Sequence, residues 1–274
     1  MKLSFDAKVK LNNGLEMPII GLGVYQADSE ETEHAVKIAL DNGYRLIDTA
    51  EAYKNEEEVG KAINKSEVAR EEIFVTTKLW NKDQGYDKTL KAFDKSLDKL
   101  NMDYVDLYLL HWPVEGKRID SYKALEKILE SGKTKAIGVS NFTIRHLEEL
   151  MKETEVVPAL NQVEFHTFLY QKELLEYCKE KNIRLEAYSP IARGKKFKHN
   201  VIQEMAEKYS KTPAQIMLRW ILQHDVIVIP KSTHKERIIE NANIFDFEIA
   251  EEDISKLDGI DEEYRIAWDP SEIK

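Results

Sequence analysis

Cysteine is almost absent from this sequence. Cys178 is the one cysteine among 274 residues. A single thiol cannot form a disulfide within the chain, and it excludes structural metal sites that need several cysteines. The histidines show no metal-ligand spacing either, so no metal site is expected. This usage fits a reducing compartment, and we expect a cytoplasmic protein.

Long hydrophobic runs and an excess of positive charge are also missing. No segment approaches about 18 consecutive apolar residues, and residues 1–6 lack the apolar run of a signal peptide. The 50 acidic side chains outnumber the 40 basic ones, for a net charge of -10. Nucleic acids and anionic membranes attract basic surfaces. We therefore expect neither as the main partner.

Segments rich in glycine, proline or serine, which would mark a linker, do not interrupt the chain. Short apolar segments instead alternate with longer amphipathic ones from end to end. A hairpin is expected first, from residues 8–11 and 15–17 around Asn12-Asn13-Gly14. Eight further strands are expected at 19–24, 45–49, 73–77, 104–110, 135–139, 159–163, 184–187 and 226–229. Helices are expected at 30–42, 56–64, 88–100, 121–130, 144–153, 172–181, 201–211, 235–241 and 251–259.

Alternation of strands and helices is typical of a parallel sheet, either open or closed. An open, doubly wound sheet would carry a glycine-rich phosphate loop after its first strand. Gly21 and Gly23 supply two glycines there, but a third is missing and no helix begins at once. We therefore predict an α/β fold, a (β/α)8 TIM barrel whose N-terminal hairpin closes the bottom. It should form a single domain over residues 1–274, with its functional groups where the strands end.

Polar side chains follow several of these expected strands, and four of them suit one reaction. Burial of Lys78 beside the hydroxyl of Tyr53 would favour the phenolate and lower its pKa, while Asp48 would keep the lysine charged. His111 can hydrogen-bond a substrate oxygen. Each of these residues alone is more often structural than catalytic. Together they suit proton donation to a carbonyl oxygen while a cofactor supplies hydride, which no side chain can do.

The chain also resembles the aldo-keto reductases along nearly its whole length. The segments that carry the resemblance are 43–50 with Tyr53, 75–80, 108–113, 137–142, 161–164 and 229–233 with Arg237. Short segments after His111 and at the C-terminus make the chain similar to compact microbial members related to the diketogluconate reductases. The resemblance implies a monomer that reduces aldehydes and ketones to alcohols with NADPH.

The resemblance implies the same roles for the four residues. Tyr53 is implied as the general acid, Asp48 and Lys78 as the residues that tune it, and His111 as the guide for the carbonyl. The substrate is expected to contact Tyr25, Trp80, His111 and Trp112.

The cofactor is implied to extend across the strand ends. Its nicotinamide carboxamide is expected to bind Ser140, Asn141 and Gln162, and its ring to stack on Tyr188. Further contacts are expected from Gly23, Val24, Tyr25, Asp48, Ser189, Ile191 and Thr233.

At the other end of the cofactor, Lys231, Ser232 and Arg237 are implied to hold the 2′-phosphate. Two cations with hydroxyl groups before a helix are also a physically suitable phosphate site. Glu240 and Asn241 are expected to contact the adenine.

Two features depart from the family pattern or add to it. Lys54 follows Tyr53 where many relatives carry glycine or another small residue, and it is expected to alter either the mouth of the site or the approach of the cofactor. The basic loop 191–199 is either a cover for the cofactor pyrophosphate or a solvated loop.

The alternative function is that of a protein that senses NADP(H) with little or no turnover. The intact set of four residues disfavours this alternative.

Overall fold

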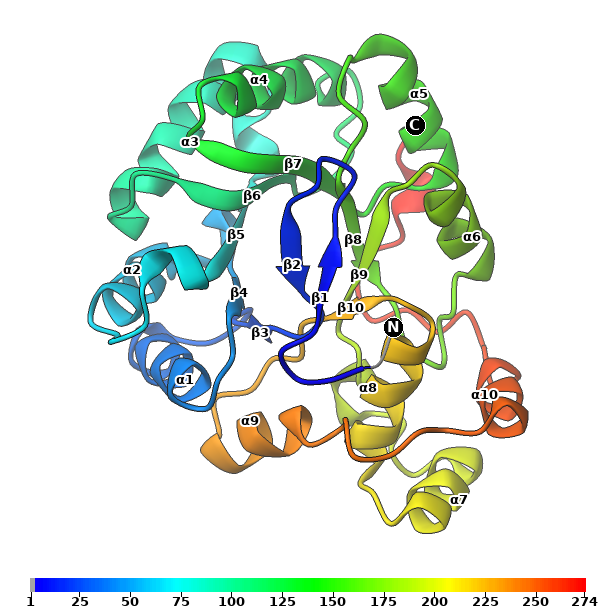
Figure 1. Ribbon diagram of the computed structural model, residues 1–274. Helices are drawn as coiled ribbons and strands as arrows, with labels where there is room; N and C mark the ends of the chain where they lie inside the picture. The colour runs from blue at the N-terminus through cyan, green and yellow to red at the C-terminus, as the bar shows by residue number, and fades with distance from the viewer. Residues whose placement is uncertain (1–2) are drawn as a thin grey trace.

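The computed structural model describes residues 3–274, and its centre is a sheet of eight parallel strands that curls around on itself (Figure 1). The strands lie in chain order: β3 (Leu22–Gly23), β4 (Leu46–Asp48), β5 (Phe74–Leu79), β6 (Val105–Leu110), β7 (Thr134–Ser140), β8 (Leu160–Glu164), β9 (Arg184–Tyr188) and β10 (Ile227–Val228). Parallel bridges join Ile20 to Val228 and Gly23 to Lys231, so the first and last strands meet. The predicted closed barrel is confirmed.

The helices surround this barrel (Figure 1). They are α1 (Ser29–Asp41), α2 (Glu56–Asn64), α3 (Tyr86–Leu100), α4 (Arg118–Glu130), α5 (Ile144–Glu153), α6 (Lys172–Glu180), α7 (Asn200–Tyr209), α8 (Pro213–Gln223), α9 (Lys235–Ala242) and α10 (Glu251–Asp258). Five short 3-10 helices lie between them: η1 (Glu51–Tyr53), η2 (Arg70–Glu72), η3 (Asn81–Asp83), η4 (Ala192–Gly194) and η5 (Pro270–Glu272). In the part of the chain that the structure describes, no helix is long and apolar enough to span a bilayer.

Two of the sequence predictions about these elements were wrong. Helix α8 was missed because residues 214–222 are all buried, so the segment lacks the polar face of an amphipathic helix. Its start did carry a signal, since the Thr212 side chain accepts from the Gln215 N–H and Pro213 begins the helix. The strands expected at 19–24 and 226–229 are shorter than predicted, because the barrel closes there through isolated bridges.

The N-terminal hairpin closes one end of the barrel. Strands β1 (Lys8–Lys10) and β2 (Glu16–Pro18) pair antiparallel and cross the end of the barrel in Figure 1. The Asn13 side chain donates to the Lys135 carbonyl at 2.9 Å, and Arg184 donates to the Lys10 carbonyl at 3.1 Å. Both barrel residues lie where their strands begin, so the predicted hairpin closure is confirmed.

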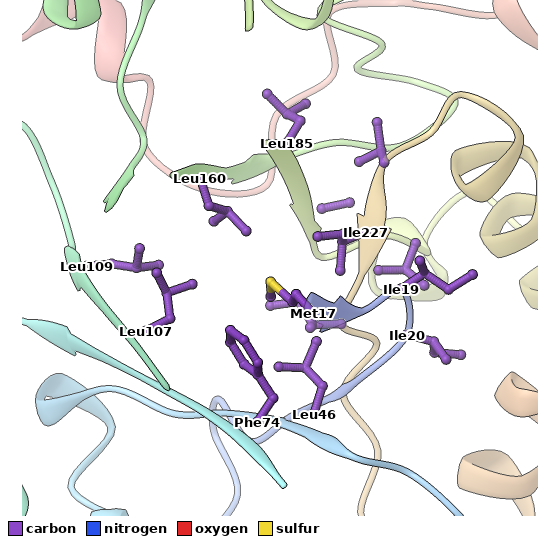
Figure 2. Packing of buried hydrophobic residues seen from close by; sticks show 14 of the residues in the cluster. Met17, Ile19, Ile20, Leu46, Phe74, Leu107, Leu109, Leu160, Leu185 and Ile227 are labelled. Carbon is purple, nitrogen blue, oxygen red and sulfur yellow. The ribbon is translucent and has the colours of Figure 1, made fainter. Parts of the chain in front are cut away.

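Apolar side chains fill the hairpin end of the barrel interior. Fully buried Met17 lies among side chains from several strands, including Leu46, Phe74, Leu107 and Leu160 (Figure 2). Residues two or four positions along a strand point to the same face. The interior face that begins with these apolar residues therefore continues to polar residues at the opposite end: Asp48 on β4, Lys78 on β5, His111 after β6 and Gln162 on β8.

Candidate active site

A cleft of about 510 Å³ opens at the end of the barrel where the strands terminate. The predicted site residues that line it are Gly23, Tyr25, Asp48, Tyr53, Trp80, His111, Trp112, Ser140, Asn141, Gln162, Tyr188, Ser189, Ile191, Lys231 and Arg237. The predicted residues outside this lining are Val24, Lys78, Ser232, Thr233, Glu240 and Asn241. The structure thus brings most of the expected site together from residues far apart in the sequence.

Tyr53, Lys78 and Asp48 meet at the cleft. The Lys78 ammonium lies 2.7 Å from Asp48 Oδ1 and 3.4 Å from the Tyr53 hydroxyl. It also donates to the Thr49 carbonyl at 2.9 Å. Lys78 and Asp48 are buried, whereas the Tyr53 ring is half-buried at the cleft. The lysine therefore lies behind the tyrosine, which explains why it does not line the cleft itself.

The electrostatics of this group correct one expectation. The pKa of Tyr53 lies well above its ordinary value, because burial disfavours the phenolate and the negative charge of Asp48 adds to that effect. The expectation of a lowered pKa for Tyr53 was wrong, since its net shift is upward. Burial also raises the pKa of Asp48, although Lys78 opposes that shift. Tyr53 therefore keeps its proton at neutral pH.

His111 forms one wall beside Tyr53. Its ring centroid lies 5.7 Å from that of Tyr53 and 5.1 Å from that of Trp80. Burial first, and then the charge of Lys78, hold the pKa of His111 well below its usual range, so the ring is neutral. Its Nδ1 is buried without a hydrogen-bond partner among residues 3–274. A neutral imidazole can donate one hydrogen bond to a polar group in the cleft.

A hydrogen-bonded group of polar side chains also lines the cleft. The Tyr188 hydroxyl donates to Asn141 Oδ1 at 2.7 Å, and Asn141 Nδ2 donates to the His111 carbonyl at 2.9 Å. The Ser140 hydroxyl donates to the Gln162 carbonyl at 2.8 Å. Asn141 has a left-handed backbone, with φ of 64°, which asparagine tolerates better than most residues. These bonds hold four predicted cofactor contacts in fixed positions.

Two basic side chains belong to the lining of the cleft. Lys231 and Arg237 both line it and are exposed. Within the described residues, no carboxylate lies within 4.0 Å of either cation. The Glu240 carboxylate is occupied elsewhere, because it accepts from the Thr212 hydroxyl at 2.6 Å. The Lys231 ammonium donates to the Gln26 carbonyl at 3.4 Å. Two cations without a carboxylate partner in the lining of a cleft suit an anionic group of a ligand.

Other predicted cofactor residues lie near the cleft but do not line it. Val24 is buried, and its N–H donates to the Asp48 carbonyl at 3.2 Å. The Ser232 hydroxyl accepts from the His234 N–H at 3.1 Å. Asn241 is buried on α9, and Thr233 is half-buried.

Lys54 lies outside the lining of the cleft, whereas part of the basic loop 191–199 belongs to that lining. Lys54 is exposed and does not line the cleft, and its φ of 60° is the left-handed conformation that glycine adopts readily. In the loop, Lys196 is paired with Glu262 at 2.7 Å, whereas Arg193 lines the cleft. The loop therefore presents one guanidinium to the site instead of its lysines.

A C-terminal segment that no sequence prediction included also lines the cleft. Ile266, Ala267 and Trp268 line it, and the Trp268 ring lies 5.5 Å from that of Trp112. Trp268 is 69% exposed. This exposure, which only the structure reveals, is consistent with a role at a binding site.

A buried carboxylate holds this segment against the barrel. Glu164 at the end of β8 accepts from the N–H groups of Ile266 at 2.7 Å and Ala267 at 2.8 Å. His166 lies 3.0 Å from the same carboxylate. Burial raises the pKa of Glu164, but the hydrogen bonds from His166 and the two amides outweigh it, so the net pKa is lowered. Glu164 is therefore ionised and ties two distant parts of the chain together.

Replacing Glu164 with glutamine is expected to loosen this wall of the cleft. The amide group retains one acceptor oxygen but turns an NH2 group toward an N–H, so one hydrogen bond to a charged acceptor, worth about 1.5–3 kcal/mol, is lost. Hydrogen exchange at the Ile266 and Ala267 amides should become at least about tenfold faster. The exposed Glu176→Gln variant is the matched control. Unchanged protection in the Glu164 variant would show that other contacts hold the segment.

Comparison with known proteins agrees with this geometry. Residues 19–262 match the model of the Aldo/keto reductase family. The chain is 53% identical over 274 residues to the glyoxal reductase of Bacillus subtilis (strain 168), covering 100% of this chain and 99% of that protein. It superposes with a TM-score of 0.94 on an aldo-keto reductase from a Medee basin deep-sea metagenome library, at 48% identity over 97% of this chain and 99% of that one. A Gox0644 mutant solved in complex with NADPH gives a TM-score of 0.93 at 42% identity, over 98% and 99% of the two chains. This chain belongs to the Aldo/keto reductase family.

Proposed function

We propose that this protein reduces aldehydes or ketones to alcohols, with NADPH as the hydride donor and Tyr53 as the proton donor. The observation that supports it most is the contact of the Tyr53 hydroxyl, which lines the cleft, with the buried Lys78 ammonium 3.4 Å behind it. A carbonyl oxygen between Tyr53 and His111 would accept a hydrogen bond from each. Tyr53 then gives its proton to the oxygen, and Lys78 stabilises the phenolate that forms.

The cleft residues fit a nicotinamide dinucleotide phosphate. When bound, the dinucleotide supplies the hydride. Ser140, Asn141 and Gln162 would hold its carboxamide, and Tyr188 would pack against its ring. Lys231 and Arg237, which have no carboxylate partner among the described residues, would hold its phosphate. The relative solved with NADPH supports this choice.

Steady-state kinetics test the proposal. NADPH and NADH consumption should be compared over about twenty carbonyl compounds, with glyoxal included because one relative is named a glyoxal reductase. Turnover of at least one carbonyl with NADPH is expected. Tight NADPH binding with negligible turnover throughout would favour the sensor instead.

The phosphate assignment makes a separate prediction. Each charge-assisted hydrogen bond is worth about 1.5–3 kcal/mol, so Arg237→Met or Lys231→Met should weaken NADPH binding by roughly 10- to 100-fold. NADH lacks the 2′-phosphate, so its affinity should change little. Fluorescence titration with both dinucleotides measures the difference, and Lys235→Met on the same helix is the control. Equal losses for NADPH and NADH would contradict the assignment.

The remaining expectations stay predictions. They are a single domain over residues 1–274, a monomer and a cytoplasmic location. Light scattering coupled to gel filtration tests the monomer.

A further inference from the structure

A second buried carboxyl group lies in the barrel interior beside the proposed catalytic residues. Glu186 on β9 is fully buried, two positions before Tyr188. Its Oε2 accepts a hydrogen bond from Gln162 Nε2 at 2.6 Å. Its Oε1 is buried and has no hydrogen-bond partner in the described part of the chain. The reaction as proposed above makes no use of this group.

Gln162 connects Glu186 to Asp48. The same Gln162 Nε2 donates to Asp48 Oδ2 at 2.8 Å, so two carboxyl groups share the two hydrogens of one amide nitrogen. Lys78 contacts Asp48 at 2.7 Å, and no ion pair joins it to Glu186 within the described residues. One ammonium therefore accompanies two buried carboxyl groups.

This charge count favours a proton on one carboxyl group. If both were ionised, the dry interior would hold an uncompensated negative charge, which costs several kcal/mol. Neighbouring carboxyl groups resolve such a conflict by keeping a proton on one of them. Asp48 is paired with Lys78, so Glu186 is the carboxyl group that stays neutral. In agreement, burial first and then the charge of Asp48 raise the pKa of Glu186 to about 8.

The arrangement has two consequences for the cleft. With both Gln162 N–H bonds directed at carboxyl oxygens, the orientation of its amide is set, and Gln162 lines the cleft. The charge of an ionised Glu186 would also raise the pKa of Tyr53 further and make it a weaker acid. The titratable groups that face Glu186 are Asp48 of β4, Tyr53 of η1 and Lys78 of β5. Strand β10 places Ile227 beside it.

We propose that Glu186 is a positioning residue for the carbonyl reduction, which holds a proton in the working enzyme, orients Gln162 and slows turnover when it ionises. This inference rests on the proposed function for its kinetic part. Its structural part, a neutral Glu186, can be measured without any substrate.

Infrared spectroscopy tests the structural part. At pH 7 the wild-type protein should show the carbonyl stretch of a neutral, buried carboxyl group, and Glu186→Gln should abolish it. The exposed Glu176→Gln variant should retain it. Absence of the band from the wild type, or its persistence in Glu186→Gln, would overturn the proposal even if the enzyme reduces carbonyls well.

The ratio of kcat at pH 9 to kcat at pH 7 tests the kinetic part. One pH unit above its pKa only about a tenth of Glu186 is protonated, so the wild-type ratio should fall to roughly 0.1. Glu186→Gln cannot ionise, and its ratio should stay above about 0.5 because the pKa of Tyr53 lies higher still. Equal ratios in the two proteins would refute a role for ionisation of Glu186. Absence of turnover in both, with the infrared band present, would instead count against the proposed function.

A third variant separates charge from orientation. Glu186→Leu also cannot ionise, but it leaves Gln162 with one acceptor fewer. Its kcat ratio should match that of Glu186→Gln, while its KM for NADPH should be about tenfold higher than in that variant. Equal KM values would remove the orienting role. If Glu186→Leu does not fold, the KM of Glu186→Ala gives the same comparison.

Thermal unfolding gives a further readout that needs no activity. The pKa of Glu186 in the folded protein is raised above its ordinary value. The contribution of Glu186 to stability is therefore complete below the ordinary pKa of glutamate and is lost as pH rises to about 8. The melting temperature of Glu186→Gln minus that of the wild type should therefore increase from about pH 5 to about pH 8. A constant difference over this interval would contradict a proton held by Glu186.

Discussion

Replacing Tyr53 with phenylalanine is expected to lower turnover by at least about 100-fold with little loss of NADPH affinity, which is the usual size of a general-acid effect. The substitution removes the hydroxyl that lies 3.4 Å from Lys78 and keeps the ring that packs beside His111. Single-turnover and steady-state rates measure the loss, and fluorescence titration measures cofactor binding.

Tyr25→Phe is the matched control for this experiment. The Tyr25 ring also lines the cleft, 5.0 Å from that of Tyr53, but its hydroxyl has no hydrogen bond to Lys78. Its turnover should change by less than about tenfold, because it gives no proton. Turnover near that of the wild type in Tyr53→Phe would rule out the proton-donor role.

Replacing Lys78 with methionine is expected to damage both stability and activity. The substitution leaves Asp48 buried without its cation, and breaking a buried ion pair costs about 3–5 kcal/mol. Turnover should fall by at least about 100-fold, since the phenolate of Tyr53 loses its stabilising charge. Urea unfolding measures the stability, and steady-state assays at permissive temperature measure the turnover.

The stability loss should depend on pH in a defined direction. The pKa of Asp48 is already raised by burial, and removing Lys78 removes a group that lowers it. A carboxyl group whose folded pKa is raised contributes stability below its ordinary pKa and loses it as pH rises. The Lys78→Met protein should therefore be less impaired near pH 5 than near pH 8.

The double variant Asp48→Asn/Lys78→Met is the control for the charge argument. It removes both charges and keeps the buried volume similar, so much of the lost stability should return. If the double variant is no more stable than Lys78→Met, an uncompensated charge is not the cause of the loss.

Local patterns in the sequence determined the fold class, and together with the family resemblance they predicted the four residues of the proposed reaction. Apolar segments of strand length and amphipathic segments of helix length alternate along the chain. Each segment shows in its own spacing of apolar residues which of its side chains are buried. The same patterning placed Asp48, Lys78 and His111 where strands end, and the structure brings these residues together at one end of the barrel. Helix α8 was not predicted, because it is buried on all sides and has no polar face.

Only the tertiary structure decided the properties that arise between segments. The raised pKa of Tyr53, the sharing of Gln162 by Asp48 and Glu186, and the bonds from Glu164 to residues about a hundred positions later all depend on closure of the barrel. Burial and charge act through space, whereas a sequence pattern reports only neighbours along the chain. Most residues that line the cleft could thus be predicted from the sequence, but its C-terminal wall and the protonation states within it required the assembled barrel.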